Sequence, residues 1–140
     1  MSQMAIFLPV LALAGWTMTV LLLIPITVFR AVFAGEVTLE QFKLGVSPPN
    51  VSSPASLPNR NFMNLLEVPV LFYVLCVILY VTQQTDATAV YLAWAYVGLR
   101  VLHSFIHLTY NKVLHRGLVY GASNLILMVI LVTTLLRVIK

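Results

Sequence analysis

Ionisable side chains recur inside long apolar runs of this chain, where a membrane helix does not normally tolerate them. Glu67 lies in the apolar run 62–81, Arg100 in the run 87–108, and Arg116 at the start of the last run. A charged side chain inside lipid is costly, so it normally faces a protein interior or a wet cavity and has a function there. Three such groups at one depth predict a buried polar pocket in an otherwise apolar protein.

The polar residues of three runs fall three or four positions apart, which places each set on one face of a helix. These sets are Arg60, Asn64 and Glu67; Arg100, His103 and His107; and Arg116, Tyr120 and Asn124. One interpretation is structural, with an ion pair such as Glu67 with Arg100 joining two helices. Because the cations outnumber the single carboxylate, a site for an anionic ligand is the interpretation that we favour.

The composition indicates an integral membrane protein with a single domain. Of 140 residues, 61% are hydrophobic and 9% are charged, far from the usual mixture in soluble proteins. The formal charge of +4 comes from scattered basic residues, which excludes nucleic acid as an expected partner and suggests a role in membrane orientation.

Four apolar stretches are long enough to cross a hydrocarbon core, each needing about 20 residues. We expect spans at about 4–33, 58–82, 87–110 and 117–139, with a long connection at about 34–57. The other connections are short, so successive helices should be antiparallel neighbours in an all-α, up-down bundle of four. We also expect bends near Pro25 and Pro69, and a short interfacial helix at Glu36 to Phe42.

Basic residues near the span ends predict the orientation, because they favour the cytoplasmic side. The side with the long connection carries more of them than the side with the termini. They are Arg30, Lys43, Arg60, Lys112 and Arg116 on the first side, and Arg137 and Lys140 on the second. We therefore expect a cytoplasmic long loop, periplasmic termini, and the polar residues in the cytoplasmic half.

A metal site is the weaker interpretation of the histidines. His103 and His107 share a helix face, but zinc usually needs a third protein ligand. No HExxH pattern is present in the sequence. We expect no metal.

The motifs of the last three spans resemble the MAPEG family, the membrane-associated proteins of eicosanoid and glutathione metabolism. The resemblance rests on the segment from Arg60 to Glu67, on Arg100 to His103, and on Arg116 to Tyr120, and it covers nearly the whole chain. It implies a trimer of four-helix subunits that binds glutathione between neighbouring subunits, in the cytoplasmic half of the membrane.

The resemblance also implies roles for individual residues. Arg116 favours the glutathione thiolate, and Arg30 resembles an arginine supplied by the adjoining subunit. Asn64, Glu67, Arg100, His103, His107 and Tyr120 bind glutathione or substrate, and Arg60 is structural. The polar residues of the spans suit the chemical groups of glutathione, because arginines pair with carboxylates and a nearby cation lowers the pKa of a thiol.

The chain departs from the family pattern at several positions. His107 stands where many members have tyrosine, Met63 where some have a basic residue, and Gly117 where some have a hydroxyl residue. Pro69 follows Glu67 more closely than in several relatives. These differences argue against an eicosanoid synthase.

The resulting expectation is a bacterial-type, inner-membrane glutathione transferase or peroxidase that acts on hydrophobic electrophiles or lipid hydroperoxides. Glutathione is its co-substrate, and its other partners are a hydrophobic molecule or lipid and two further copies of the chain. The alternative is a non-catalytic lipid-binding or scaffold protein of the same fold. A small ion-coupled transporter, with Glu67 and the histidines as relays, is a third interpretation.

Overall fold

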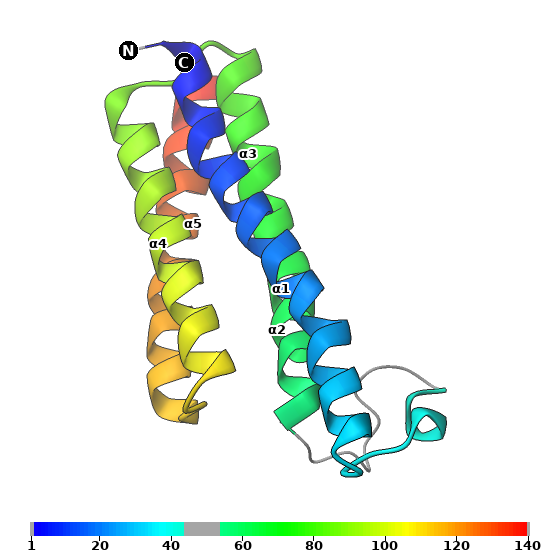
Figure 1. The fold of residues 1–140 in the computed structure, drawn as a ribbon. Helices are drawn as coiled ribbons and strands as arrows, with labels where there is room; N and C mark the ends of the chain where they lie inside the picture. The colour runs from blue at the N-terminus through cyan, green and yellow to red at the C-terminus, as the bar shows by residue number, and fades with distance from the viewer. Residues whose placement is uncertain (1, 44–53, 140) are drawn as a thin grey trace.

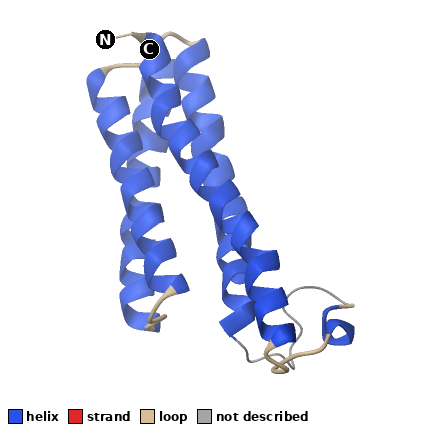
Figure 2. Cartoon of the chain, viewed as in Figure 1, coloured by secondary structure: helices blue, strands red, loops and turns tan. Residues whose placement is uncertain are grey.

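The computed structural model describes residues 2–43 and 54–139. The described part of the chain consists of helices and loops, without a strand (Figure 2). The 3-10 helices are η1 (Gln3–Ile6), η2 (Leu39–Phe42) and η3 (Pro54–Ser56); the α-helices are α1 (Phe7–Phe33), α2 (Leu57–Leu66), α3 (Pro69–Val81), α4 (Ala87–Leu108) and α5 (Val113–Val138). The predicted all-α fold class is confirmed.

Four helical stretches are long and apolar enough to cross a membrane: Gln3–Phe33, Pro54–Val81, Ala87–Leu108 and Val113–Val138. They run up and down, so both termini lie at one end, and the α4–α5 turn lies at the other end with the beginning of α2 (Figure 1). The last helix begins at Val113, rather than at residue 117 as expected. The backbone of Asn111 is left-handed (φ 47°) and Lys112 is extended, so the reversal is complete by residue 112.

The two prolines within the spans behave differently. Helix α1 is continuous through Pro25, whereas the second span is divided into α2 and α3 just before Pro69. Glu67 has a ψ of −90°, outside the helical range, and ends α2. Proline lacks an amide N–H and its ring crowds the preceding turn, which favours a break at Pro69, whereas α1 accommodates Pro25 without one.

The long connection holds less helix than its sequence suggested. The interfacial helix expected at Glu36 to Phe42 is present only as the short η2, Leu39–Phe42. It starts at Thr38 with a capping box that involves Gln41. Residues 44–53 of the expected loop lie outside the described residues.

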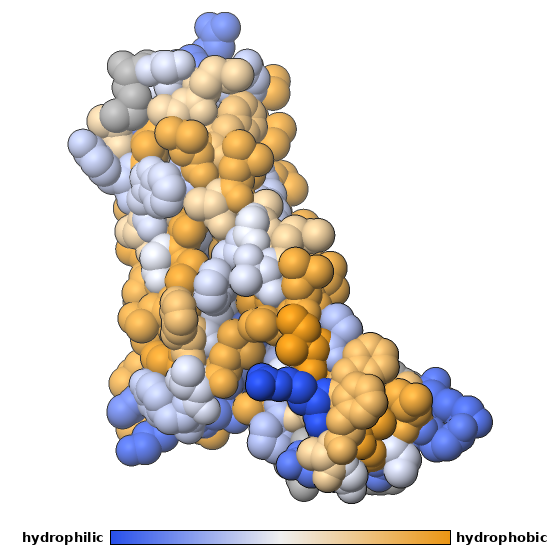
Figure 3. All heavy atoms as spheres, in the orientation of Figure 1, coloured by the Kyte–Doolittle hydropathy of each residue, from blue (hydrophilic) through white to orange (hydrophobic). Residues whose placement is uncertain are grey.

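Helix α4 packs against α1, α2 and α5, and α3 also contributes side chains to the core of the bundle. Leu13, Val20, Phe72 and Tyr96 are fully buried, and the rings of Phe72 and Tyr96 stack at 4.7 Å. Other large apolar side chains point outward along the helices, as expected for surfaces that face lipid. Figure 3 shows apolar residues along the shaft of the visible face and hydrophilic residues gathered at both ends.

Candidate functional site

A cavity of about 230 Å³ opens among α2, α4 and α5 in the half of the molecule opposite the termini. It brings together a cation, an amide, an imidazole and a phenol from three helices. The lining residues are Asn64, His103, Val113, Arg116, Gly117 and Tyr120. Four of the residues predicted from the sequence as a site therefore share one cavity: Asn64, His103, Arg116 and Tyr120.

Arg116 is held in this cavity by the turn that precedes α5. The left-handed backbone of Asn111 reverses the chain, and the Asn111 side-chain oxygen accepts a hydrogen bond of 2.8 Å from Arg116 Nη1. The first turn of α5 contains no acidic residue. The partial positive charge of this helix end therefore adds to that of the guanidinium, and the site favours an anion.

The rings of Tyr120, His103 and His107 lie next to one another in that order, and the first two line the cavity. The His103 ring lies 5.6 Å from that of Tyr120 and 5.9 Å from that of His107, measured between centroids. Both histidines are buried, and neither Nδ1 atom has a hydrogen-bond partner among the described residues. Buried polar atoms are normally paired, so these two atoms are exceptions; His103 lines the cavity, whereas His107 does not.

Arg100 lies deeper than the cavity and is fully buried. One of its guanidinium nitrogens, Nη2, donates to the backbone carbonyl of Asn64, and its Cζ lies 5.4 Å from the centre of the Tyr120 ring. Nε and Nη1 have no hydrogen-bond partner among the described residues. Arg100 is therefore next to the cavity-lining residues without being one of them.

Glu67 and Arg60 are exposed and do not line this cavity. Glu67 lies at the end of α2, and the structure shows no ion pair between it and Arg100, two residues that it describes. The Arg60 carbonyl accepts a hydrogen bond of 2.9 Å from the Asn64 side chain. The simple Glu67–Arg100 bridge considered from the sequence is thus absent from the described residues.

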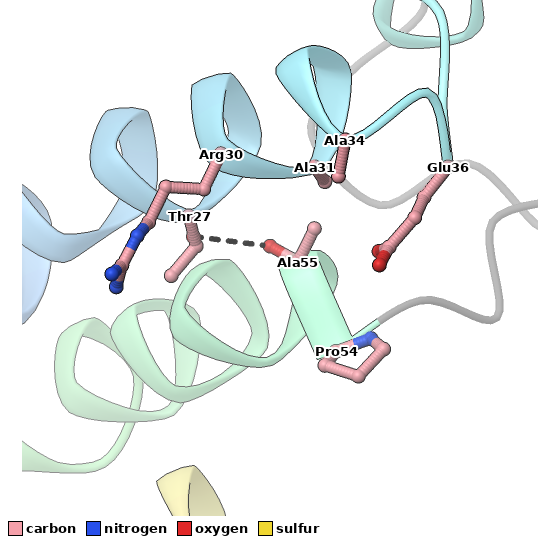
Figure 4. A pocket seen from close by; sticks show the side chains of 7 residues that line it. All are labelled: Thr27, Arg30, Ala31, Ala34, Glu36, Pro54 and Ala55. Atoms are coloured by element: carbon pink, nitrogen blue, oxygen red, sulfur yellow. Dashed lines mark hydrogen bonds between the residues drawn. The ribbon is translucent and has the colours of Figure 1, made fainter.

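Arg30 belongs to a different cavity, of about 290 Å³, between the end of α1 and η3. Its lining residues are Thr27, Arg30, Ala31, Ala34, Glu36, Pro54 and Ala55. In Figure 4 the Arg30 guanidinium extends along α1, away from Glu36. Within one chain, the structure does not bring Arg30 into the cavity that contains Arg116.

A buried polar contact between α2 and α4 was not identified from the sequence. Asn61 and Ser104 are both fully buried, and Ser104 Oγ donates to Asn61 Oδ1 at 3.1 Å. The available signal was position: Asn61 lies next to Arg60, and Ser104 follows His103. Both residues are uncharged, and a neutral polar residue in an apolar run is a weaker sign of a buried contact than an ionisable one.

The described residues contain no group of three His, Cys, Asp or Glu side chains that could hold a metal ion. Charge-assisted hydrogen bonds to a polar organic anion are what the arrangement can provide.

The fold and the cavity define a polytopic α-helical membrane protein with a polar site in one half of its bundle. The chain matches the model of the MAPEG family over residues 6–136, and it belongs to that family. It is thus a membrane protein of the family involved in glutathione and eicosanoid metabolism. Comparisons with curated proteins and with solved structures find no match.

Proposed function

We propose that this protein transfers glutathione to apolar electrophiles or uses it to reduce lipid hydroperoxides. The observation that carries the proposal is the cavity in which Arg116, Asn64, His103 and Tyr120 meet. Glutathione offers carboxylates, an ammonium, amides and a thiol, and this set of side chains can bind groups of each kind.

In the proposed reaction, Arg116 stabilises the glutathione thiolate, which is the nucleophilic form of the thiol. In transfer, the thiolate sulfur attacks an electrophilic carbon, a carbon–sulfur bond forms, and any leaving group departs with its electron pair. In peroxide reduction, the sulfur attacks the terminal peroxide oxygen, the O–O bond breaks to give a sulfenic acid, and the departing alkoxide takes a proton from water to become an alcohol. A second glutathione then reduces the oxidised sulfur, which gives glutathione disulfide and water.

Glu67 and Arg30 enter the proposal through a second copy of the chain. Glu67 is an exposed carboxylate within the span Pro54–Val81, where contact with hydrocarbon is costly. A neighbouring subunit would cover this Glu67 and would bring its own Arg30 toward the cavity. Glu67 would then bind the ammonium group of a glutathione molecule held between the two subunits. These two positions support an assembly with glutathione between subunits, and membership of the MAPEG family favours a homotrimer.

We further propose an inner-membrane location in a bacterial cell, with both termini periplasmic. The termini lie at the same end of the bundle (Figure 1). Most of the basic residues near span ends lie at the opposite end, including Arg30, Arg60 and Arg116. Basic residues favour the cytoplasmic side, which supports this orientation.

A second candidate function is non-catalytic lipid binding. An apolar groove of about 400 Å³ runs between α3 and α5, and Asn124 is its one polar lining residue. The lining residues are Val68, Leu71, Val74, Leu75, Ile78, Asn124, Leu127, Met128 and Leu131. A protein that only bound lipid would use this groove and would not require Arg116.

Glutathione titration of the detergent-solubilised protein by calorimetry tests the first candidate. The wild type should bind, and Arg116→Ala and Glu67→Ala should each weaken binding by about tenfold or more, as expected when a charge-assisted hydrogen bond is lost. Arg137→Ala removes an arginine at the opposite end of the bundle and should leave binding unchanged. Absence of binding by the wild type at millimolar glutathione would refute the proposal.

Turnover assays then separate the two candidates. If the protein is an enzyme, conjugation of an aromatic electrophile or reduction of a lipid hydroperoxide should fall by about 100-fold in Arg116→Ala, the usual effect of removing one group that stabilises developing charge. Lipid binding without glutathione turnover in the wild type would favour the second candidate.

A further inference from the structure

The second span is broken at a point where its backbone needs another hydrogen-bond donor. In a continuous helix, the carbonyl of Asn64 would accept from the N–H of Val68. The structure shows no such bond between these two described residues, because α2 ends at Leu66 and α3 begins at Pro69. Arg100 Nη2 donates to the Asn64 carbonyl instead.

The geometry of Arg100 connects this break to the rest of the site. Arg100 lies on α4, bonds to the backbone of α2, and lies 5.4 Å from the centre of the Tyr120 ring on α5. Its side chain is fully buried. Asn64 is half-buried, and a partly buried carbonyl without a donor is costly, as is a fully buried guanidinium without an acceptor. Each of these two groups therefore requires the other.

From these contacts we infer that Arg100 is a positioning residue that holds the break between α2 and α3 open in its observed geometry. The direction of the Asn64 side chain into the cavity, and that of Glu67 at the break, follow from the local backbone. Arg100 fixes this backbone through the Asn64 carbonyl without lining the cavity itself. We call the hydrogen bond from Arg100 to the Asn64 carbonyl at the helix break the clasp. The predicted effect on glutathione binding rests on the proposed function, whereas the clasp itself does not.

A double-mutant cycle with Pro69 tests the clasp by thermal unfolding in detergent. Arg100→Met removes the donor and should lower Tm by about 5 °C or more. Pro69→Ala allows α2 and α3 to join, so that the Val68 N–H reaches the Asn64 carbonyl. The double variant Arg100→Met/Pro69→Ala should therefore regain most of the lost Tm. Such a non-additive result would show that the two sites are coupled.

Pro25→Ala provides the matched control, because α1 is continuous at that proline. Its effect on Tm should add to that of Arg100→Met without recovery. If the effects of Pro69→Ala and Arg100→Met are also simply additive, the clasp is wrong.

Glutathione affinity separates positioning from a purely structural role. Arg100→Met should weaken binding by about tenfold or more. The double variant should recover Tm but not affinity, because the continuous helix turns Asn64 and Glu67 out of place. Arg100→Lys keeps one donor for the carbonyl and should bind within a few-fold of the wild type.

The two proposals fail separately. If the wild type does not bind glutathione, the proposed function is wrong, and the Tm cycle alone decides the clasp. If affinity recovers together with Tm in the double variant, Arg100 supports the fold without positioning the site, and the inference is overturned.

Discussion

Gly117 is the cavity residue whose replacement is easiest to interpret. Apart from its chain neighbours and the backbone of its own helix, a Cβ at this position would meet no heavy atom within 4 Å, and the residue lies beside Arg116. Gly117→Ser should therefore fold normally and place a hydroxyl in the cavity. Because a hydroxyl can donate to a thiolate, the variant should bind glutathione a few-fold more tightly, as measured by calorimetry.

Gly121→Ser is the control for this change. Gly121 lies one turn further along α5, is equally open, and does not line the cavity. Both serines should slightly stabilise α5, since glycine is a poor helix former. Only the serine at position 117 should affect glutathione. An equal effect of both variants on binding would mean that the cavity is not the glutathione site.

At the residue scale, the sequence could predict which polar side chains share a helix face, but not which atoms they contact. Helical spacing correctly grouped His103 with His107, whose ring centroids lie 5.9 Å apart. It could not show that Arg100 bonds to a backbone carbonyl, because that carbonyl is freed only by the break at Pro69. It also could not place Arg30, whose side chain lines another cavity within the same subunit.

At the scale of the elements, the bond between Asn61 and Ser104 joins α2 to α4. Ser104→Ala leaves the buried Asn61 oxygen without its donor and should cost about 1–3 kcal/mol of unfolding free energy. The double variant Asn61→Leu/Ser104→Ala removes both polar groups and should be closer to the wild type. Denaturation in mixed micelles measures both effects, and a double variant less stable than Ser104→Ala would contradict this explanation.

The opposite end of the bundle is closed by Asp86, which caps α4 and pairs with Arg137 at 2.7 Å. Partial burial raises the pKa of Asp86, but the hydrogen bond from the Ala89 N–H and the charge of Arg137 lower it more, so the net pKa lies below its ordinary value. A lowered folded pKa means that this stabilisation is present at neutral pH. It is lost as the pH falls below about 4 toward the folded pKa.

The measurement is Tm as a function of pH for the wild type and Asp86→Asn. The difference in Tm between them should be constant near neutral pH and should shrink below about pH 4. Glu40→Gln is the control, because Glu40 pairs with Lys43 at the exposed surface, where ion pairs contribute little. A difference that grows as the pH falls would show that the ionised form of Asp86 does not stabilise this end.

The helices themselves were predictable because their apolar runs are long and the last two connections are short. The break in the second span was harder to place, since Pro25 and Pro69 look equivalent in the sequence. Among the described residues, Arg100 of the neighbouring helix α4 supplies a donor to the disturbed backbone before Pro69. This contact between segments distant in sequence distinguishes the two prolines.

At the scale of the whole molecule, the residues predicted to bind glutathione do not all line one cavity of a single chain. The cavity with Arg116 is formed within one chain, whereas Glu67 is exposed beside it and Arg30 is directed elsewhere. The exposed Glu67 supports a contact with a second copy of the chain, because an uncovered carboxylate within a membrane span is costly. Assembly and ligand binding are best tested together.

A cryo-electron microscopy structure of the detergent-solubilised protein with bound glutathione tests the central claim most directly. The account predicts a trimer with density for the tripeptide in the cavity lined by Asn64, His103, Arg116 and Tyr120. Its sulfur should lie next to Arg116, and a neighbouring subunit should contribute Arg30. Density elsewhere, or an empty cavity at saturating glutathione, would contradict the account.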